Sequence, residues 1–426
     1  MGMHESTRRR LCRAAFWLVC VLPTALVLGW CHWQRQPGRV AEAEALLSSL
    51  TGLTARASAV SRPRPGVVRL VGVQLREPES SAEVASCERL EIRRYRNLIK
   101  VSLAGAELDA DRLGRLWPAI DLRMQRWQAD WPSITVQSPE VAVRSQHGQL
   151  TLRASDCDLA GLRFVGDEVQ GWLAFRVAEL DNTGPVTAWA KREKQATRPT
   201  TRFELTSTKA WLPAWLLAGG CPPLAQVHPR AKLRGAVSAA HAPLGWDAKL
   251  TGIELQGQEL LRVLSSKLPA LGTWPLQVHI EQAALQEGRI VSATGKVRGG
   301  VGQVSPATLA RIQLALGAAP PGRAPASPRS SVDFDELNAA FRLDREGLQL
   351  TGLCRGPIAG VVLRSSRGPL LALQEHRSRS PKVLLDMFAQ ENAGAVPAGA
   401  ATEGLLSLLP TPPLFEVSSR QFDQRR

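Results

Sequence analysis

Most of this chain alternates apolar and polar residues with a period of two. Leu150 and Leu152, for example, alternate with Thr151 and Arg153. A strand of this kind has one apolar face and one wet face, which is typical of antiparallel sheets packed on one side. The same alternation recurs near residues 134–144, 169–177, 203–205, 276–280 and 341–350. It predicts a meandering, mainly β protein without βαβ units.

The alternation also predicts which side chains share the apolar face. Turns at His147-Gly148 and at residues 345–347 join neighbouring runs into hairpins. The residues that this alternation places on one dry face include Leu150, Leu152, Leu173, Phe175, Val177, Phe203, Leu205, Leu276, Val278 and Ile280.

Short segments with helical spacing interrupt the strands. Helices that cover the sheet are predicted over residues 109–117, 209–218, 259–268, 305–312 and 382–392. Trp211 and Trp215 are four residues apart and would share one face of the second helix. They are candidates for core packing, for a lid over the groove mouth or for a membrane contact.

The N-terminal segment has the pattern of a membrane anchor. Eighteen residues without a formal charge, 14–31, follow the basic cluster Arg8, Arg9, Arg10 and Arg13. This length suits a membrane-spanning helix, and flanking arginines stay on the cytoplasmic side. We expect a cytoplasmic N-terminus (1–13), a single inner-membrane span (14–33) and a juxtamembrane helix (34–52). The small-x-small site at residues 41–43 contains a charge, so we expect the anchor to be retained, with the bulk of the chain in the periplasm.

The charge and the cysteine content of the chain do not alter the prediction of a membrane-anchored, mainly β protein. The formal net charge is +15, but only nine of the 53 basic residues are lysines, and the arginines are scattered through strand-like segments. Such a composition is typical of a GC-rich genome. We interpret the densest basic run, at residues 191–194, as a loop with solvated charges or as a contact with anionic lipid headgroups. Nucleic acid is not an expected partner of an exported chain. Disulfide pairing is left open among Cys87, Cys157, Cys221 and Cys354.

Catalytic signatures are absent from the sequence. Its histidines are isolated, and it contains no His-Glu-x-x-His, Cys-x-x-Cys or Gly-x-Ser-x-Gly motif. Residues 294–296 lack the first glycine of a phosphate loop, and Asp156 and Asp158 read as solvated residues of a strand. We therefore predict no catalytic residues, no metal site and no cofactor.

A short string recurs at residues 70–75, 250–255 and 350–353, each time with a glycine inside a strand pattern. Such a glycine predicts a bulge, and its recurrence fits either repeated sheet units or convergence. Residues 63–75, followed by the acidic turn Glu77-Pro78-Glu79, resemble the N-terminal region of AsmA-like proteins. Residues 288–295 and 337–352 resemble later strands of planctomycete proteins of that type.

The resemblance implies an elongated, curled antiparallel sheet that hangs from the inner membrane. Its groove would be apolar inside, and the ten dry-face residues from Leu150 to Ile280 named above are the candidates that line it. The resemblance assigns the groove to residues 53–316 and 332–392, with a Pro/Ala-rich loop at 317–331 and a flexible tail at 393–426. About 16 strands would span only roughly 75 Å, too little to bridge two membranes. The expected function is non-enzymatic: sheltering lipid acyl chains or assisting envelope biogenesis, with membrane lipids and other envelope proteins as partners. The alternative is a scaffold with a closed core that binds proteins and no lipid.

Overall fold

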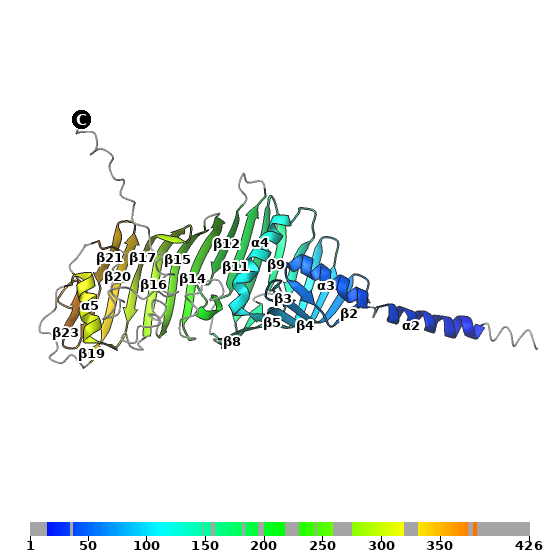
Figure 1. The fold of residues 1–426 in the computed structure, drawn as a ribbon, viewed down its shortest axis with the longest axis horizontal. Coiled ribbons are helices and arrows are strands. Elements are labelled where there is room, and N and C mark those ends of the chain that lie inside the picture. Colours follow the sequence, from blue (N-terminus) through cyan, green and yellow to red (C-terminus); the bar gives the residue numbers. More distant parts are fainter. Residues whose placement is uncertain are drawn as a thin grey trace, which may run out of the picture.

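The structure is a computed structural model that describes residues 15–34, 37–146, 148–154, 158–180, 184–194, 200–217, 230–242, 245–258, 275–318, 331–373 and 378–380. Over these residues the chain is mainly β. One 21-stranded sheet runs the length of the molecule, and β18 (Gly302–Val304) pairs separately with β19 (Val332–Phe334). Figure 1 shows the strands side by side in one long, curled layer, with few helices. The predicted elongated, mainly antiparallel β-sheet is confirmed.

The strands follow the chain closely in space. The first half contains β1 (Thr54–Arg56), β2 (Ala59–Arg64), β3 (Val67–Arg76), β4 (Glu83–Arg94), β5 (Leu98–Asp109), β6 (Ser133–Gln137), β7 (Glu140–Ser145), β8 (Gly148–Ala154), β9 (Ala160–Val165), β10 (Glu168–Val177), β11 (Val186–Glu193), β12 (Thr201–Thr206) and β13 (Leu212–Pro213). The second half contains β14 (Lys232–Ala242), β15 (Gly245–Gln258), β16 (Pro275–Gln286), β17 (Arg289–Gly299), β20 (Glu336–Asp344), β21 (Gly347–Gly352), β22 (Val361–Ser365) and β23 (Gly368–Ala372).

The prediction that the sheet contains no βαβ unit is wrong at one place. Strand β5 pairs in parallel with both β6 and β7. Between β5 and β6 the chain runs through a 3-10 helix (Ala110–Arg115) and α4 (Leu116–Arg126). The helical crossover returns the chain to the end of the sheet where β5 began, so the next strand is parallel. The hairpins predicted near residues 147 and 345–347 are present, because β7 pairs with β8 and β20 with β21 antiparallel.

Register places the apolar residues on one face, which we call the dry face; the opposite side is the wet face. Val278 lies opposite Leu255 on one neighbouring strand and opposite Val297 on the other. The next dry-face position of β16, Ile280, lies opposite Ile253 and Gly295. Because side chains alternate along every strand, one such register sets the facing of whole strands.

Two rows of irregular positions cross the sheet and bend its strands. Gly235 in β14 and Glu281 in β16 fall at register shifts, and Gly252 between them has φ +58°. A second row runs through Gly72 (φ +59°) and Gly105 (φ +60°). Bulges bend a strand and increase its twist, so rows of them help to curl the sheet. The first two recurring strings thus share a left-handed glycine, Gly72 or Gly252.

Helices α3 (Pro37–Thr51), α4 and α5 (Pro306–Leu316) lie over the same side of the sheet in Figure 1. Buried residues of each, such as Leu47, Met124 and Leu309, pack against dry-face residues. Ser305 caps the N-terminus of α5 by accepting a hydrogen bond from the Thr308 amide, so the helix predicted at 305–312 is present and extends to Leu316. The helix predicted at 109–117 begins as a 3-10 turn and continues to Arg126. Those predicted at 259–268 and 382–392 lie outside the described residues.

The helix predicted over residues 209–218 is wrong. The segment forms a turn, the two-residue strand β13 and a single 3-10 turn, Ala214–Leu217. Pro213 lacks an amide hydrogen and disfavours an α-conformation in the residue before it, which ends a regular helix here. Trp211 and Trp215 therefore do not share a helical face. Trp215 is 5% exposed and belongs to the core, which excludes it as a membrane contact in this conformation.

The N-terminal helical segment projects from the end of the sheet (Figure 1). A π-helical stretch, Trp17–Val21, precedes α2 (Leu22–Gln34). Among the described residues, no helix meets the combined length and hydropathy expected of a membrane span. The structure does not confirm the predicted span at 14–33, and membrane anchoring stays a prediction. The juxtamembrane helix expected within 34–52 corresponds to α3.

Two of the four cysteines considered for disulfides are described, Cys87 in β4 and Cys354 after β21, and both are buried free thiols. Burial raises the pKa of each thiol to about 11, with a further contribution from the nearby Glu336 carboxylate at Cys354. Cys157 and Cys221 lie outside the described residues.

Candidate functional site

The ten residues predicted to line a groove all belong to the dry face. Val177 and Phe175 of β10 lie opposite Leu152 and Ala154 of β8, while Leu173 lies opposite Ala188 of β11. Their burial divides them into two groups. Fully buried are Leu150, Leu152, Phe175, Val177 and Leu276; half-buried are Leu173, Phe203, Leu205, Val278 and Ile280.

The buried group lies mostly in a section that the chain itself closes. Trp215 in the 3-10 turn packs into the same core as Leu150 and Phe175, and its indole approaches the backbone at Gly148. Helix α4 covers the other end of these strands, where Met124 and Trp127 pack on Val169. This closed section, β7 to β11, is filled by side chains of the chain itself.

A more open stretch follows between β12 and β21. Although Leu276, Ala283, Ala293, Leu343 and Leu348 are buried, many of its larger dry-face side chains are half-buried. They form neighbouring cross-strand pairs such as Leu205 with Val237, Val278 with Val297, and Phe341 with Leu350. We call this the open stretch; its half-buried residues include Phe203, Leu205, Val237, Leu250, Leu255, Val278, Ile280, Val297, Phe341 and Leu350.

A polar clamp holds α4 on the dry face. Arg192 Nη1 lies 3.3 Å from Asp121 Oδ1 of α4 and donates a 2.8 Å hydrogen bond to Thr201 Oγ1. The Thr201 hydroxyl donates to the same Asp121 oxygen. Lys194 Nζ donates to the carbonyl oxygens of Met124, at 2.7 Å, and of Gln125. The side chain of Arg192 is only 14% exposed, so this ion pair is shielded from solvent.

An aromatic cluster follows at the end of α4. The Arg123 guanidinium lies 4.9 Å from the ring centre of Trp127 and 4.5 Å from that of Trp131. Desolvation, followed by repulsion from Arg126, lowers the pKa of Arg123. Trp127 is 2% exposed, and its indole N–H has no hydrogen-bond partner. A buried donor left unpaired costs about 1–3 kcal/mol.

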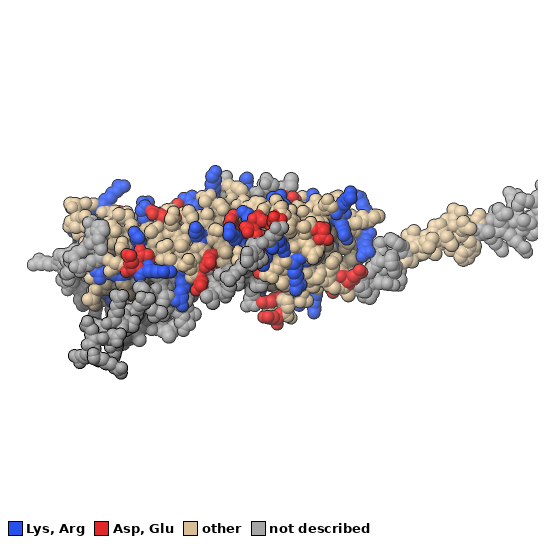
Figure 2. All heavy atoms as spheres, turned by 90° about the horizontal axis from the view of Figure 1, so that it is seen from above, with Lys and Arg blue, Asp and Glu red and all other residues tan. Residues whose placement is uncertain are grey.

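The clamp corrects the reading of residues 191–194 as a solvated loop. The run ends strand β11, and its side chains alternate between the two faces. Lys191 points to the wet face, where it pairs with Glu204 at 3.4 Å, whereas Arg192 points to the dry face. Desolvation, followed by repulsion from Arg192, lowers the pKa of Lys194. Figure 2 shows basic and acidic side chains interspersed over the face in view, not gathered into one basic patch.

The wet face carries polar hollows. One, with a volume of about 260 Å³, is lined by Glu254, Gln277, His279, Lys296 and Arg298. Glu254 pairs with Arg234 at 2.6 Å and lies 3.7 Å from His279 Nδ1, and Lys296 pairs with Glu281 at 2.6 Å.

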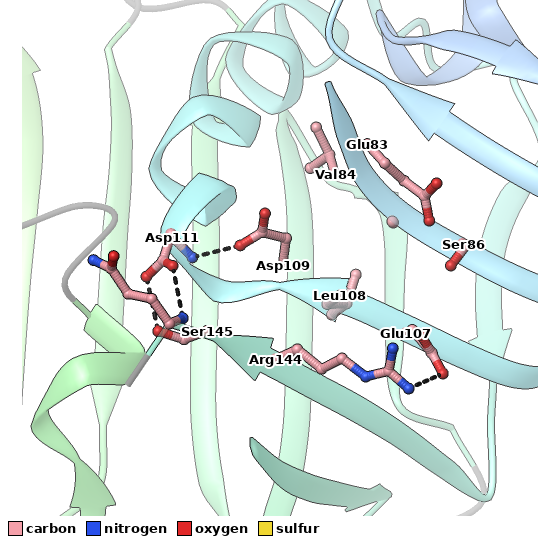
Figure 3. Close-up of a pocket in the computed structure, with 11 residues that line it drawn as sticks. Glu83, Val84, Ser86, Glu107, Leu108, Asp109, Asp111, Arg144 and Ser145 are labelled. Atoms are coloured by element: carbon pink, nitrogen blue, oxygen red, sulfur yellow. Dashed lines mark hydrogen bonds and ion pairs between the residues drawn. The ribbon is translucent and has the colours of Figure 1, made fainter. Parts of the chain in front are cut away.

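A second hollow of about 290 Å³ lies where β4, β5 and β7 meet (Figure 3). Three of its carboxylates make hydrogen bonds or ion pairs. Glu107 pairs with Arg144 at 2.7 Å, and Asp111 accepts hydrogen bonds from the Ser145 hydroxyl and the Gln146 backbone amide. Asp109 accepts one from the Asp111 amide. These bonds tie the parallel β5–β7 pair to the 3-10 helix, which is a structural role.

Within the described ranges, no three histidine, cysteine, aspartate or glutamate side chains are grouped so that they could hold a metal ion. Asp158 accepts a hydrogen bond from Gln137 at 2.7 Å, and Asp156 lies outside these ranges. No family model, curated protein or solved structure matches the chain. The arrangement that the structure does offer is an extended apolar surface with a charged clamp at one rim.

Proposed function

We propose that this chain is a non-enzymatic envelope protein of the AsmA-like type that shelters lipid acyl chains on its dry face. The observation that carries the proposal is the open stretch. Half-buried apolar side chains recur on its dry face from β12 to β21, between others that are buried. Sheltering one methylene group there is worth about 0.8 kcal/mol, so half of an acyl chain would bind usefully.

A membrane-anchored location in the periplasm belongs to the same proposal. Large apolar side chains at the N-terminal end of the molecule are more than half exposed, including Trp17, Leu18, Val19 and Leu26. An exposed apolar surface of this kind is typical of contact with a membrane or a partner. Insertion would place the dry face next to a source of lipid.

The alternative is a scaffold that binds other envelope proteins and holds no lipid. The closed section between β7 and β11 favours it, because there the dry face is filled by α4 and by Trp215. The two functions differ in what occupies the open stretch.

Native mass spectrometry of the full chain, extracted in mild detergent, distinguishes them. Lipid sheltering predicts masses increased by one or more phospholipids. Val278→Gln should reduce this bound fraction, while the matched wet-face variant Gln277→Glu should retain it. A bare mass for the unmodified chain, with circular dichroism showing a folded β-protein, would favour the scaffold.

A further inference from the structure

Beneath α4 the dry face changes from apolar to cationic. Along β11 the inward positions read Val186, Ala188 and Ala190, and then Arg192. Lys194 follows just beyond the strand, and the buried Thr201 hydroxyl lies beside Arg192 on β12. An apolar floor that ends in two cations and a hydroxyl matches an amphiphile with an anionic headgroup.

Helix α4 presents the complementary features to this floor. Its apolar part is Met124, which, with Trp127 just beyond the helix, packs on Val169 and Ala190. Its anionic part is the Asp121 carboxylate on Arg192, together with the carbonyls of Met124 and Gln125 on Lys194. Carbonyls in the last turn of a helix lack intrahelical partners and carry the negative end of its dipole. The helix thus supplies Arg192 and Lys194 with the oxygen partners that an acidic headgroup would supply.

One polar atom beneath α4 stays unpaired. The N–H of Trp127, the residue that follows the helix, is buried without a hydrogen-bond partner, while its ring packs in the same cluster as Met124. Burial also disfavours the charged form of Lys194 and lowers its pKa. A ligand that pairs these cations and releases the indole N–H to water would recover part of that cost.

We propose that the dry face beneath α4 is a binding site for an amphiphile with an anionic phosphate headgroup, and that α4 occupies this site as a self-inhibiting latch. Arg192, Lys194 and Thr201 bind the phosphate, and Val169 and Ala190 contact the acyl chain. The inference rests on the proposed lipid-sheltering function and adds a headgroup class and a gate to it.

The test uses the full chain in detergent, titrated with dihexanoyl phosphatidylglycerol as the anionic probe. Asp121→Asn should weaken the latch and raise the affinity about tenfold, which corresponds to about 1.4 kcal/mol of latch stability. Adding Arg192→Gln should abolish the gain. The matched control is Arg163→Gln on the wet face, where Arg163 lies over Trp172, and it should bind like the unmodified chain.

Two further probes separate the sources of binding. Uncharged dihexanoylglycerol should bind the open stretch alike in the unmodified chain and in Asp121→Asn, and inorganic phosphate alone should bind neither. If uncharged lipid binds but Asp121→Asn has no effect on the anionic probe, the latch is wrong while lipid sheltering stands. Binding of phosphate alone with equal affinity would overturn the amphiphile as ligand.

A measurement on the unmodified chain guards against variants that fail to fold. Hydrogen exchange of residues 116–127 should increase when phosphatidylglycerol is added, because the ligand displaces α4. Unchanged or slower exchange at saturating probe would overturn the latch.

Discussion

Gly161 and Trp172 lie directly opposite each other on β9 and β10, and the indole fills the space that a side chain at 161 would need. A β-carbon on Gly161 would lie 2.1 Å from the Trp172 ring. Gly161→Ala should therefore destabilise the fold by about 1–3 kcal/mol, measured by urea unfolding. Most of the loss should disappear in a Trp172→Ala background. Gly171→Ala, where the β-carbon would meet its neighbours at ordinary distances of 3.5 Å or more, is the control.

Gly252 tests the origin of the bend in the sheet. Its φ of +58° is left-handed, although a β-carbon there would meet nothing within 4 Å. Gly252→Ala should cost about 1–2 kcal/mol from backbone strain alone, and Gly252→Asn less, since asparagine tolerates this conformation. Gly300→Ala, also in open space but without a left-handed φ, should stay within about 0.5 kcal/mol of the unmodified chain. Equal losses of unfolding free energy in Gly252→Ala and Gly300→Ala would contradict the proposed role of Gly252 in bending the sheet.

The buried thiols predict a pH dependence. The folded-state pKa of Cys354 is raised from 9.0 to about 11, so the stability that its neutral form contributes is complete below pH 9 and is lost as pH rises toward 11. Cys354→Ala should flatten the fall in unfolding free energy over this window. At pH 8, iodoacetamide should label Cys87 and Cys354 far more slowly in the folded chain than in urea. Equal rates in both states would contradict their burial.

Topology follows from the arginines before the N-terminal apolar run. Alkaline phosphatase fused after Arg426 should be active, and a fluorescent protein that matures only in the cytoplasm should stay dark at the same position. The reverse pair of results would place the sheet in the cytoplasm and end the proposal of a periplasmic groove.

The face of the sheet to which each side chain points was predictable, because side chains alternate strictly along a strand once the position of one residue is known. Val278 and Ile280 alternate with Gln277 and His279 in the sequence, and the structure places them on opposite faces in that order. Arg192 could have been assigned to the dry face by the same counting from Ala188 and Ala190. The contact between Arg192 and Asp121 could not be predicted in this way, because Asp121 lies in α4, 71 residues earlier in the chain.

The errors arose where local pattern and backbone chemistry disagree. The apolar spacing of Trp211, Leu212, Trp215 and Leu216 suits a helix, but Pro213 interrupts it. The parallel pairing of β5 with β6 and β7 was not predicted. The sequence patterns of two strands joined by a helix do not show whether the second strand runs parallel or antiparallel to the first. The open stretch and the closed section have similar patterns of apolar and polar residues in the sequence. They differ in burial because α4 and Trp215, which lie elsewhere in the chain, pack on the closed section.

The most direct test of lipid sheltering places a photo-crosslinking residue at single positions of the full chain in cells. The account predicts that a probe at Val278, in the open stretch, traps lipid, whereas a probe at its wet-face neighbour Gln277 does not. A probe at Phe175, which is 4% exposed in the closed section, should trap only protein. Equal lipid labelling at Val278 and Gln277, or protein alone at Val278, would contradict the account.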